Sequence, residues 1–249
     1  MTEYVAKLSN APLQEVIFEI HWELDIDESN NQLYDPQFEF ALGVFANKIR
    51  EEFPYHQRIV PANFPIRILH KPIYQFWKSE NQWPVVQLGQ GIMTVNDTEK
   101  NYIWSETFKP LILLALKSLL DSYNNQIRFK FISLRYIDAI ELTEKKGLLE
   151  FINKNLQIDI KKRFNVDGEL SDISLSETYT LADDSKLGIQ INNGRKEIIN
   201  RPALIWQIAV FKNAVILAES IENWLENAHN NTSGLFRKML TKYFYDSFK

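Results

Sequence analysis

Three side chains of different chemistry lie close together in the segment Ser133–Asp138, namely Arg135, Tyr136 and Asp138. We place this segment in a strand, where a neighbouring bulge could aim the Arg135 guanidinium at an anion or at a partner carboxylate. The alternative is an ion pair within the chain, because paired charges are structural more often than catalytic. We therefore predict Arg135, Tyr136 and Asp138 as candidate ligand-binding residues, with Arg135 as the anchor for an anionic ligand.

A second group of ionisable residues alternates with apolar residues along the predicted first strand. Its members are Glu15, Glu19, His21 and Glu23. Carboxylates around a histidine could hold a divalent ion or relay a proton, but a metal site needs further ligands from other segments. A solvated strand face is the simpler interpretation. We predict no metal site and no cofactor, and we assign these four residues to a partner-binding surface.

The six tryptophans lie within strand or helix signals and could form core, an aromatic pocket or an interface. Trp77 and Trp83 flank one predicted turn, so we expect them to be the most exposed of the six. If they are exposed, a protein interface is their natural use. We therefore add Trp77 and Trp83 to the candidate partner-binding residues.

Three common enzyme motifs are absent from the sequence. Gly89-Gln90-Gly91 is followed by strand residues and not by a helix, so it predicts a tight turn and not a phosphate-binding loop. His229 falls near the end of a predicted helix, where it would cap the last carbonyls. The chain has no Gly-x-Ser-x-Gly, His-Glu-x-x-His or Walker sequence, which disfavours hydrolysis and phosphoryl transfer and favours a non-enzymatic protein.

Strand and helix signals occur twice in the order strand, helix, three strands, helix. In the first half the strands cover residues 15–24, 73–78, 85–88 and 92–95, and the helices cover 35–53 and 104–123. In the second half the strands cover residues 126–142, 173–181, 187–191 and 204–211. The helices of that half cover 147–156 and the C-terminal region, which is broken at 230–234.

The short turns between strands predict antiparallel pairing, and therefore an α+β fold with helices packed on one face of the sheet. The repeated order is consistent with a duplicated β-α-β-β-β-α unit, although chance alternation also produces such patterns. We predict two halves, 1–124 and 125–249, within one compact unit.

Composition excludes several classes of protein. The 249 residues carry a net charge of −4, are 45% hydrophobic and include no cysteine, which excludes disorder, disulfides, cysteine-ligated metals and a thiol nucleophile. The segment Leu111–Leu120 is too short to span a membrane, and the N-terminus lacks a signal peptide. A pI near 5.7 argues against direct binding of nucleic acid. We expect a cytoplasmic protein with no membrane or nucleic-acid partner.

Acidic residues are concentrated early in the chain. Between Glu15 and Glu39 there are eight carboxylates and no lysine or arginine. Such a surface can steer a basic protein toward it, although plain solubility explains the same pattern.

The opening segment Leu8–Ile20, LSNAPLQEVIFEI, resembles the N-terminal signature of a sporadically distributed family of bacterial and archaeal proteins of unassigned function. Later segments that are also similar are Leu88–Asn96, Tyr102–Trp104, Leu134–Asp138, Ala228-His229 and Phe236. A patchy distribution is typical of mobile genes such as toxin–antitoxin or phage-defence modules. The resemblance implies no catalytic residues.

We predict a cytosolic, non-enzymatic module that binds another protein, as the accessory or neutralising component of a defence or toxin–antitoxin pair. Exposed sheet edges and the acidic surface would supply the contacts. A hypothesis from another class is a small-molecule-binding protein or enzyme, with Arg135 in a pocket between sheet and helices. A structural homo-oligomer is the third alternative.

Overall fold

The computed structural model describes residues 8–61, 71–80, 82–98, 100–142, 148–161, 163–168, 170–196 and 201–249. The strands are β1 (Leu13–Trp22), β2 (Asp25–Asp27), β3 (Gln32–Tyr34), β4 (Tyr55–Arg58), β5 (Tyr74–Ser79), β6 (Gln82–Gly89), β7 (Ile92–Asp97), β8 (Phe129–Glu141), β9 (Ser174–Thr180), β10 (Lys186–Lys196) and β11 (Arg201–Ile216). The helices are α1 (Phe38–Ile49), α2 (Lys109–Ser122), α3 (Leu148–Asn155), α4 (Ile221–Met239) and α5 (Lys242–Asp246). A π-helical turn, η2 (Trp104–Phe108), precedes α2, and a 3-10 turn, η3 (Ala218–Ser220), precedes α4.

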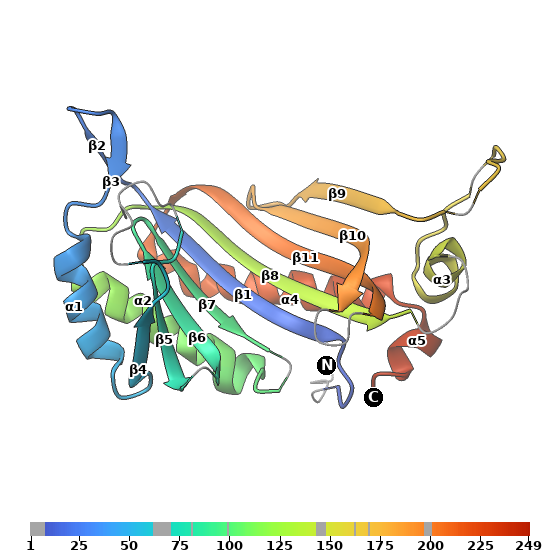
Figure 1. Cartoon of the computed structure of the whole chain (residues 1–249), viewed down its shortest axis with the longest axis horizontal. Coiled ribbons are helices and arrows are strands. Elements are labelled where there is room, and N and C mark those ends of the chain that lie inside the picture. Colours follow the sequence, from blue (N-terminus) through green and yellow to red (C-terminus); the bar gives the residue numbers. More distant parts are fainter. Residues whose placement is uncertain are drawn as a thin grey trace. The chain divides into compact units, whose positions relative to one another are not determined.

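Nine strands form one sheet in the order β4-β5-β6-β7-β1-β8-β11-β10-β9, and β2 and β3 form a separate ribbon (Figure 1). Neighbouring strands from β4 to β1 pair antiparallel, as do β9 and β10. The predicted α+β fold is confirmed. The run β5-β6-β7-β1 also has the same chain order as the run β9-β10-β11-β8, so the repeated element order has a counterpart in the sheet.

The chain divides into two compact units whose boundaries fall inside β1, β8, β11 and α4. Unit 1 comprises residues 1–14, 135–210 and 226–249, and unit 2 comprises residues 15–134 and 211–225. These units differ from the predicted halves 1–124 and 125–249. The division into halves at residue 124 stays a prediction.

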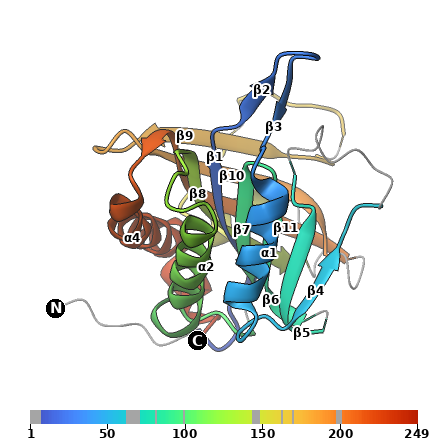
Figure 2. The same cartoon turned by 90° about the vertical axis from the view of Figure 1, so that its left-hand side faces the viewer.

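In unit 2 the core lies between the sheet and two helices that pack against each other, α1 and α2 (Figure 2). The alternation predicted for the first strand places Val16, Phe18, Ile20 and Trp22 in this core, all buried. Phe45 of α1 meets Phe76 of β5 edge to face, with ring centroids 5.4 Å apart. Sheet and helices thus bury the apolar faces that the periodicity indicates.

In unit 1 the core forms around Trp206 of β11, whose ring stacks on Phe236 of α4 at 6.2 Å. The predicted break at 230–234 is wrong, because α4 is continuous through these residues. Thr232 donates its hydroxyl hydrogen to the carbonyl of Ala228, and Asn231 donates to the carbonyl of Asn227, so these polar side chains bond back onto the helix. The apolar stripe can then continue to Phe236.

The predicted turn at Gly89-Gln90-Gly91 joins β6 to β7, and both glycines are required there. Gly91 has a φ of +72°, and a Cβ at this position would lie 2.9 Å from Cδ2 of Leu24. We expect Gly91→Ala to lower the free energy of unfolding by about 1–2 kcal/mol, because the left-handed backbone and the contact both add strain. Urea unfolding measures this. Gly43→Ala is the control, since a Cβ on that helical glycine meets nothing within 4 Å and should be neutral or stabilising.

Candidate interaction surfaces

The three candidate ligand-binding residues lie on β8, where alternation separates them. Tyr136 and Asp138 share the face of the strand that packs toward the core, and Arg135 belongs to the opposite face. The Tyr136 hydroxyl is 2.9 Å from Nδ1 of His229 on α4. Asp138 is 4% exposed. Strand geometry therefore does not gather the three side chains at one point, and their role in binding an anion stays a prediction.

Burial shifts the pKa values of Asp138 on β8 and His229 on α4 in opposite directions. Desolvation raises the pKa of the Asp138 carboxyl to about 8, while a hydrogen bond from Trp206 acts the other way. Desolvation lowers the pKa of His229 to about 4. Both groups are therefore predominantly neutral at pH 7. The expectation that His229 caps a helix is wrong, because α4 runs ten residues beyond it to Met239.

Glu15, Glu19 and His21 lie on the face of β1 opposite to its core residues, where they form hydrogen bonds within the chain. Asn96 donates its amide to Oε1 of Glu15 at 2.7 Å, and Nε2 of His21 is 2.7 Å from Oε1 of Glu19. The His21 ring also meets Phe131 edge to face at 4.9 Å. The predicted partner-binding residues of this strand are thus half-buried in a polar network, whereas Glu23 is exposed.

Polar side chains continue this network across the sheet to its edge strand β4. Gln57 donates to Gln75, Gln75 to Gln87, and Gln87 to Thr94, each at 3.0–3.1 Å. Thr94 then donates to Asn96 at 2.7 Å. In the described residues no group of three or more His, Asp or Glu side chains is arranged to hold a metal ion.

Trp77 and Trp83 lie on neighbouring strands with their rings edge to face, 5.9 Å apart. The indole of Trp83 is 36% exposed and that of Trp77 is half-buried. Trp22, Trp206 and Trp224 are buried. Of this aromatic pair, Trp83 is therefore the more accessible to a partner.

Unit 2 has an exposed apolar surface in residues 23–44, which we call the acidic–apolar segment. Its solvent-facing apolar side chains are Ile26 (59% exposed), Leu33 (39%), Phe40 (83%) and Val44 (43%). Ile26 and Leu33 are directly opposite each other on the β2–β3 ribbon, which projects from the sheet (Figures 1 and 2). Sequence reasoning missed this surface, because the exposure of Phe40 depends on how the predicted helix 35–53 packs.

The acidic–apolar segment also holds six carboxylates and no lysine or arginine. Within the described residues, Glu23, Asp25 and Glu28 form no ion pair. A small pocket of about 290 Å³ lies at the base of the ribbon and is lined by Glu23, Asp25, Asp35 and the opposing Arg128, among others. The surface thus combines exposed apolar area with an excess of negative charge.

Asp35 fastens the ribbon to the rest of unit 2. Its Oδ2 accepts hydrogen bonds from Nε1 of Trp22 at 3.0 Å and from the hydroxyl of Tyr123 at 2.6 Å. Its Oδ1 accepts the backbone N–H of Gln37 at 3.0 Å. Burial and the neighbouring Asp35 charge raise the pKa of Tyr123 far above its ordinary value, so the phenol remains a donor.

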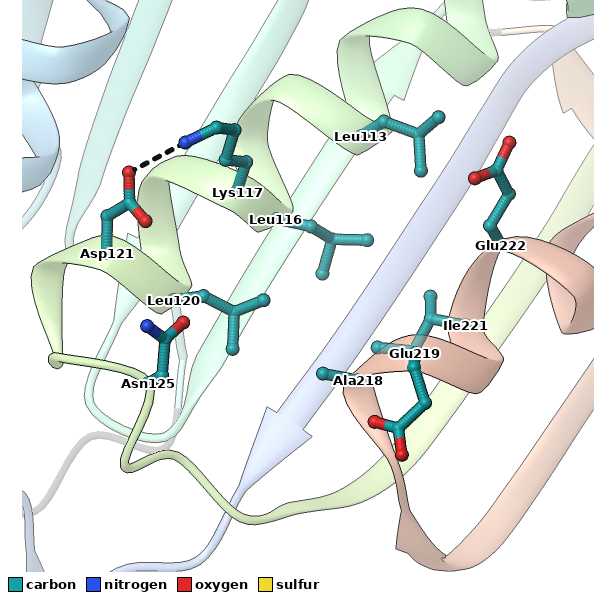
Figure 3. A pocket seen from close by; sticks show the side chains of 10 residues that line it. All are labelled: Leu113, Leu116, Lys117, Leu120, Asp121, Asn125, Ala218, Glu219, Ile221 and Glu222. Carbon is teal, nitrogen blue, oxygen red and sulfur yellow. Dashed lines mark hydrogen bonds and ion pairs between the residues drawn. The ribbon is translucent and has the colours of Figure 1, made fainter.

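A second surface is the groove between α2 and the turn η3 with the start of α4 (Figure 3). Leu113, Leu116 and Leu120 point from α2 toward Ile221, and the cavity measures about 260 Å³. The carboxylates at its rim are largely compensated. Asp121 pairs with Lys48 at 3.0 Å and with Lys117 at 3.1 Å, and Glu222 pairs with Lys109 at 2.9 Å. The groove therefore attracts a charged partner less strongly than the acidic–apolar segment.

No described helix combines the length and the apolar character needed to cross a lipid bilayer. Comparison with protein-family models, with curated proteins and with solved structures gives no match to this chain.

Proposed function

We propose that this chain is a non-enzymatic binding module that holds a basic protein partner on its acidic–apolar segment. The observation that carries the proposal is the exposure of Phe40, Ile26, Leu33 and Val44 in a segment that holds six carboxylates and no lysine or arginine. Large side chains exposed together are typical of interaction sites, because burying them against a partner removes apolar surface from water. The aromatic ring of Phe40 would be the anchor.

The charge of the segment supports a basic partner. Glu23, Asp25 and Glu28 project around the base and tip of the ribbon with no cation in residues 23–44 to neutralise them. Such a field accelerates encounter with a positively charged protein and opposes encounter with an acidic one. A cytosolic toxin or defence effector whose target is nucleic acid has this chemistry, so we retain a neutralising or accessory role in such a pair as part of the proposal.

Native mass spectrometry of the tagged chain purified from its own host tests the proposal. We expect a stoichiometric basic polypeptide with the wild-type chain and at least a tenfold loss of its affinity on Phe40→Ser, since an aromatic anchor contributes about 2 kcal/mol or more. Tyr243→Ser is the matched control, because Tyr243 is an aromatic residue of unit 1 that is 78% exposed. A partner retained equally by both variants would contradict the assigned surface.

The charge contribution is tested separately with the triple variant Glu23→Lys, Asp25→Lys and Glu28→Lys. We expect its association rate with the same polypeptide at low salt to fall about tenfold, with little remaining dependence on salt concentration. Stopped-flow mixing at several salt concentrations measures both quantities. An unchanged rate and an unchanged salt dependence would remove the basic partner from the proposal.

A further inference from the structure

Strand β9 ends the sheet in unit 1, next to β10 (Figure 1). Its seven residues, Ser174–Thr180, pair with β10 from Ser174 opposite Asn192 to Thr180 opposite Lys186. Six of the seven are exposed, and only Leu175 is half-buried. With respect to the described residues, the outer edge of β9 is thus accessible along its whole length.

The backbone of β9 offers unused hydrogen-bonding groups at this edge. In an antiparallel pair, alternate residues direct both their N–H and C=O groups away from the neighbouring strand, which here means three or four of the seven residues. Among the described residues, no hydrogen bond to the backbone of residues 174–180 occurs apart from those of the ladder with β10. These groups can therefore accept another strand.

The sequence of β9 lacks the features that usually prevent such pairing. Edge strands are commonly protected by short length, lysine, proline or a bulge. The strand β4 at the other end of the sheet has four residues, and one is Arg58. By contrast, β9 has seven residues in an unbroken register, contains no lysine, arginine or proline, and carries one charge, that of Glu177.

We propose that β9 binds an extended segment of another protein as an additional strand, with a lysine or arginine of that segment opposite Glu177. Backbone hydrogen bonds would provide affinity, and the central carboxylate would select the segment by charge. Tyr179 donates its hydroxyl hydrogen to Oε2 of Glu177, which holds the carboxylate on the same face of β9 as Leu175 and Tyr179.

A second copy of this chain fits the edge less well. The antiparallel pairing that overlaps all seven residues of two β9 strands places Glu177 directly opposite Glu177 of the other copy. Like charges directly opposite each other destabilise a sheet. The same carboxylate that attracts a basic segment therefore opposes self-pairing.

The test uses the full-length chain and a fluorescein-labelled probe peptide of sequence Thr-Val-Thr-Lys-Thr-Val-Thr with blocked ends. Fluorescence anisotropy measures its affinity, and amide NMR shifts identify the strand that it contacts. We expect the peptide to bind with shifts in 174–180, about fivefold tighter than the same peptide with glutamate in place of lysine. Glu177→Lys should reverse this preference, whereas Glu150→Lys on the exposed surface of α3 should leave it unchanged.

Methylating every second amide nitrogen of the probe removes the hydrogen-bond donors along one of its two edges, so two methylated peptides can be made. We expect binding of one of these two peptides to fall below detection. Equal binding of both patterns, or shifts outside β9, would overturn strand addition. A dimer in sedimentation velocity that disappears on Ser176→Lys would assign the edge to a second copy instead. The variant Phe40→Ser should bind the probe like the wild-type chain, so failure here and failure of the proposed function are distinguishable.

Discussion

Asp35→Ala is expected to lower the free energy of unfolding by about 3 kcal/mol. The substitution removes the common acceptor of two buried donors, the indole N–H of Trp22 and the hydroxyl of Tyr123. A buried polar group left without a partner costs about 1–3 kcal/mol, and the backbone N–H of Gln37 also loses its acceptor. Asp35 is therefore expected to be among the residues most sensitive to substitution outside the apolar core.

Urea unfolding of a graded series measures this effect. Tyr123→Phe removes only the hydroxyl donor and leaves the Asp35 carboxylate in place, so we expect the free energy of unfolding to fall by about 1 kcal/mol. Asp35→Asn keeps one carbonyl oxygen for the two donors and should fall between Tyr123→Phe and Asp35→Ala. If Asp35→Ala costs no more than Tyr123→Phe, the carboxylate does not organise this part of unit 2.

We expect Asp35→Ala to affect the proposed interaction surface as well, because Asp35 directly follows the β2–β3 ribbon and precedes α1. An isolated two-stranded ribbon is marginally stable, so its orientation depends on such fastening. We infer that Asp35 presents Ile26 and Leu33 to a partner without contacting the partner itself.

The stability of the chain is expected to increase by roughly 2 kcal/mol as the pH falls from 8 to 6.5. The pKa of Asp138 is about 8 in the folded chain against 3.8 in the unfolded chain, so only the unfolded chain is largely ionised in this interval. Each unit of acidification across the interval favours the folded state by up to about 1.4 kcal/mol. The contribution of protonated Asp138 to the free energy of unfolding is therefore lost as the pH rises toward 8.

Below pH 6.5 the histidine opposes this gain. The pKa of His229 is about 4 in the folded chain and 6.5 in the unfolded chain, so acidification there favours the unfolded state by a similar amount per unit. The two contributions cancel between about pH 6.5 and 4. We therefore expect these two groups together to produce a slope above pH 6.5 and a level region below it.

Chemical unfolding of the wild-type chain and of Asp138→Asn between pH 4 and 8 measures the difference. The variant should lose the slope between pH 6.5 and 8 and should become less stable on acidification below pH 6.5, where His229 then acts alone. Comparing the two chains removes the contribution of the exposed carboxylates, which they share. Parallel curves across the whole range would show that Asp138 is ionised in the folded state.

Local patterns in the sequence predict the elements that bury one regular face. The alternation of Val16, Phe18 and Ile20 predicts β1, and Gly91 identifies the β6–β7 turn because its left-handed backbone favours glycine. The strand β4 gives no such signal, since Tyr55–Arg58 has no buried face. The helix α4 continues past the predicted break because its core contacts outweigh the weak helix propensity of residues 230–234.

The candidate sites depend on contacts between distant segments, which periodicity cannot reveal. By itself the sequence determined the α+β class, the acidic stretch and the turn that joins β6 to β7, since each arises from neighbouring residues. Only the tertiary structure decided that Asp35 joins Trp22 to Tyr123, that Phe40 faces solvent and that β9 ends the sheet. The physical reason is that burial and hydrogen-bond partners are properties of the packed chain, in which Tyr123 donates to the carboxylate of Asp35, a residue 88 positions away in the sequence.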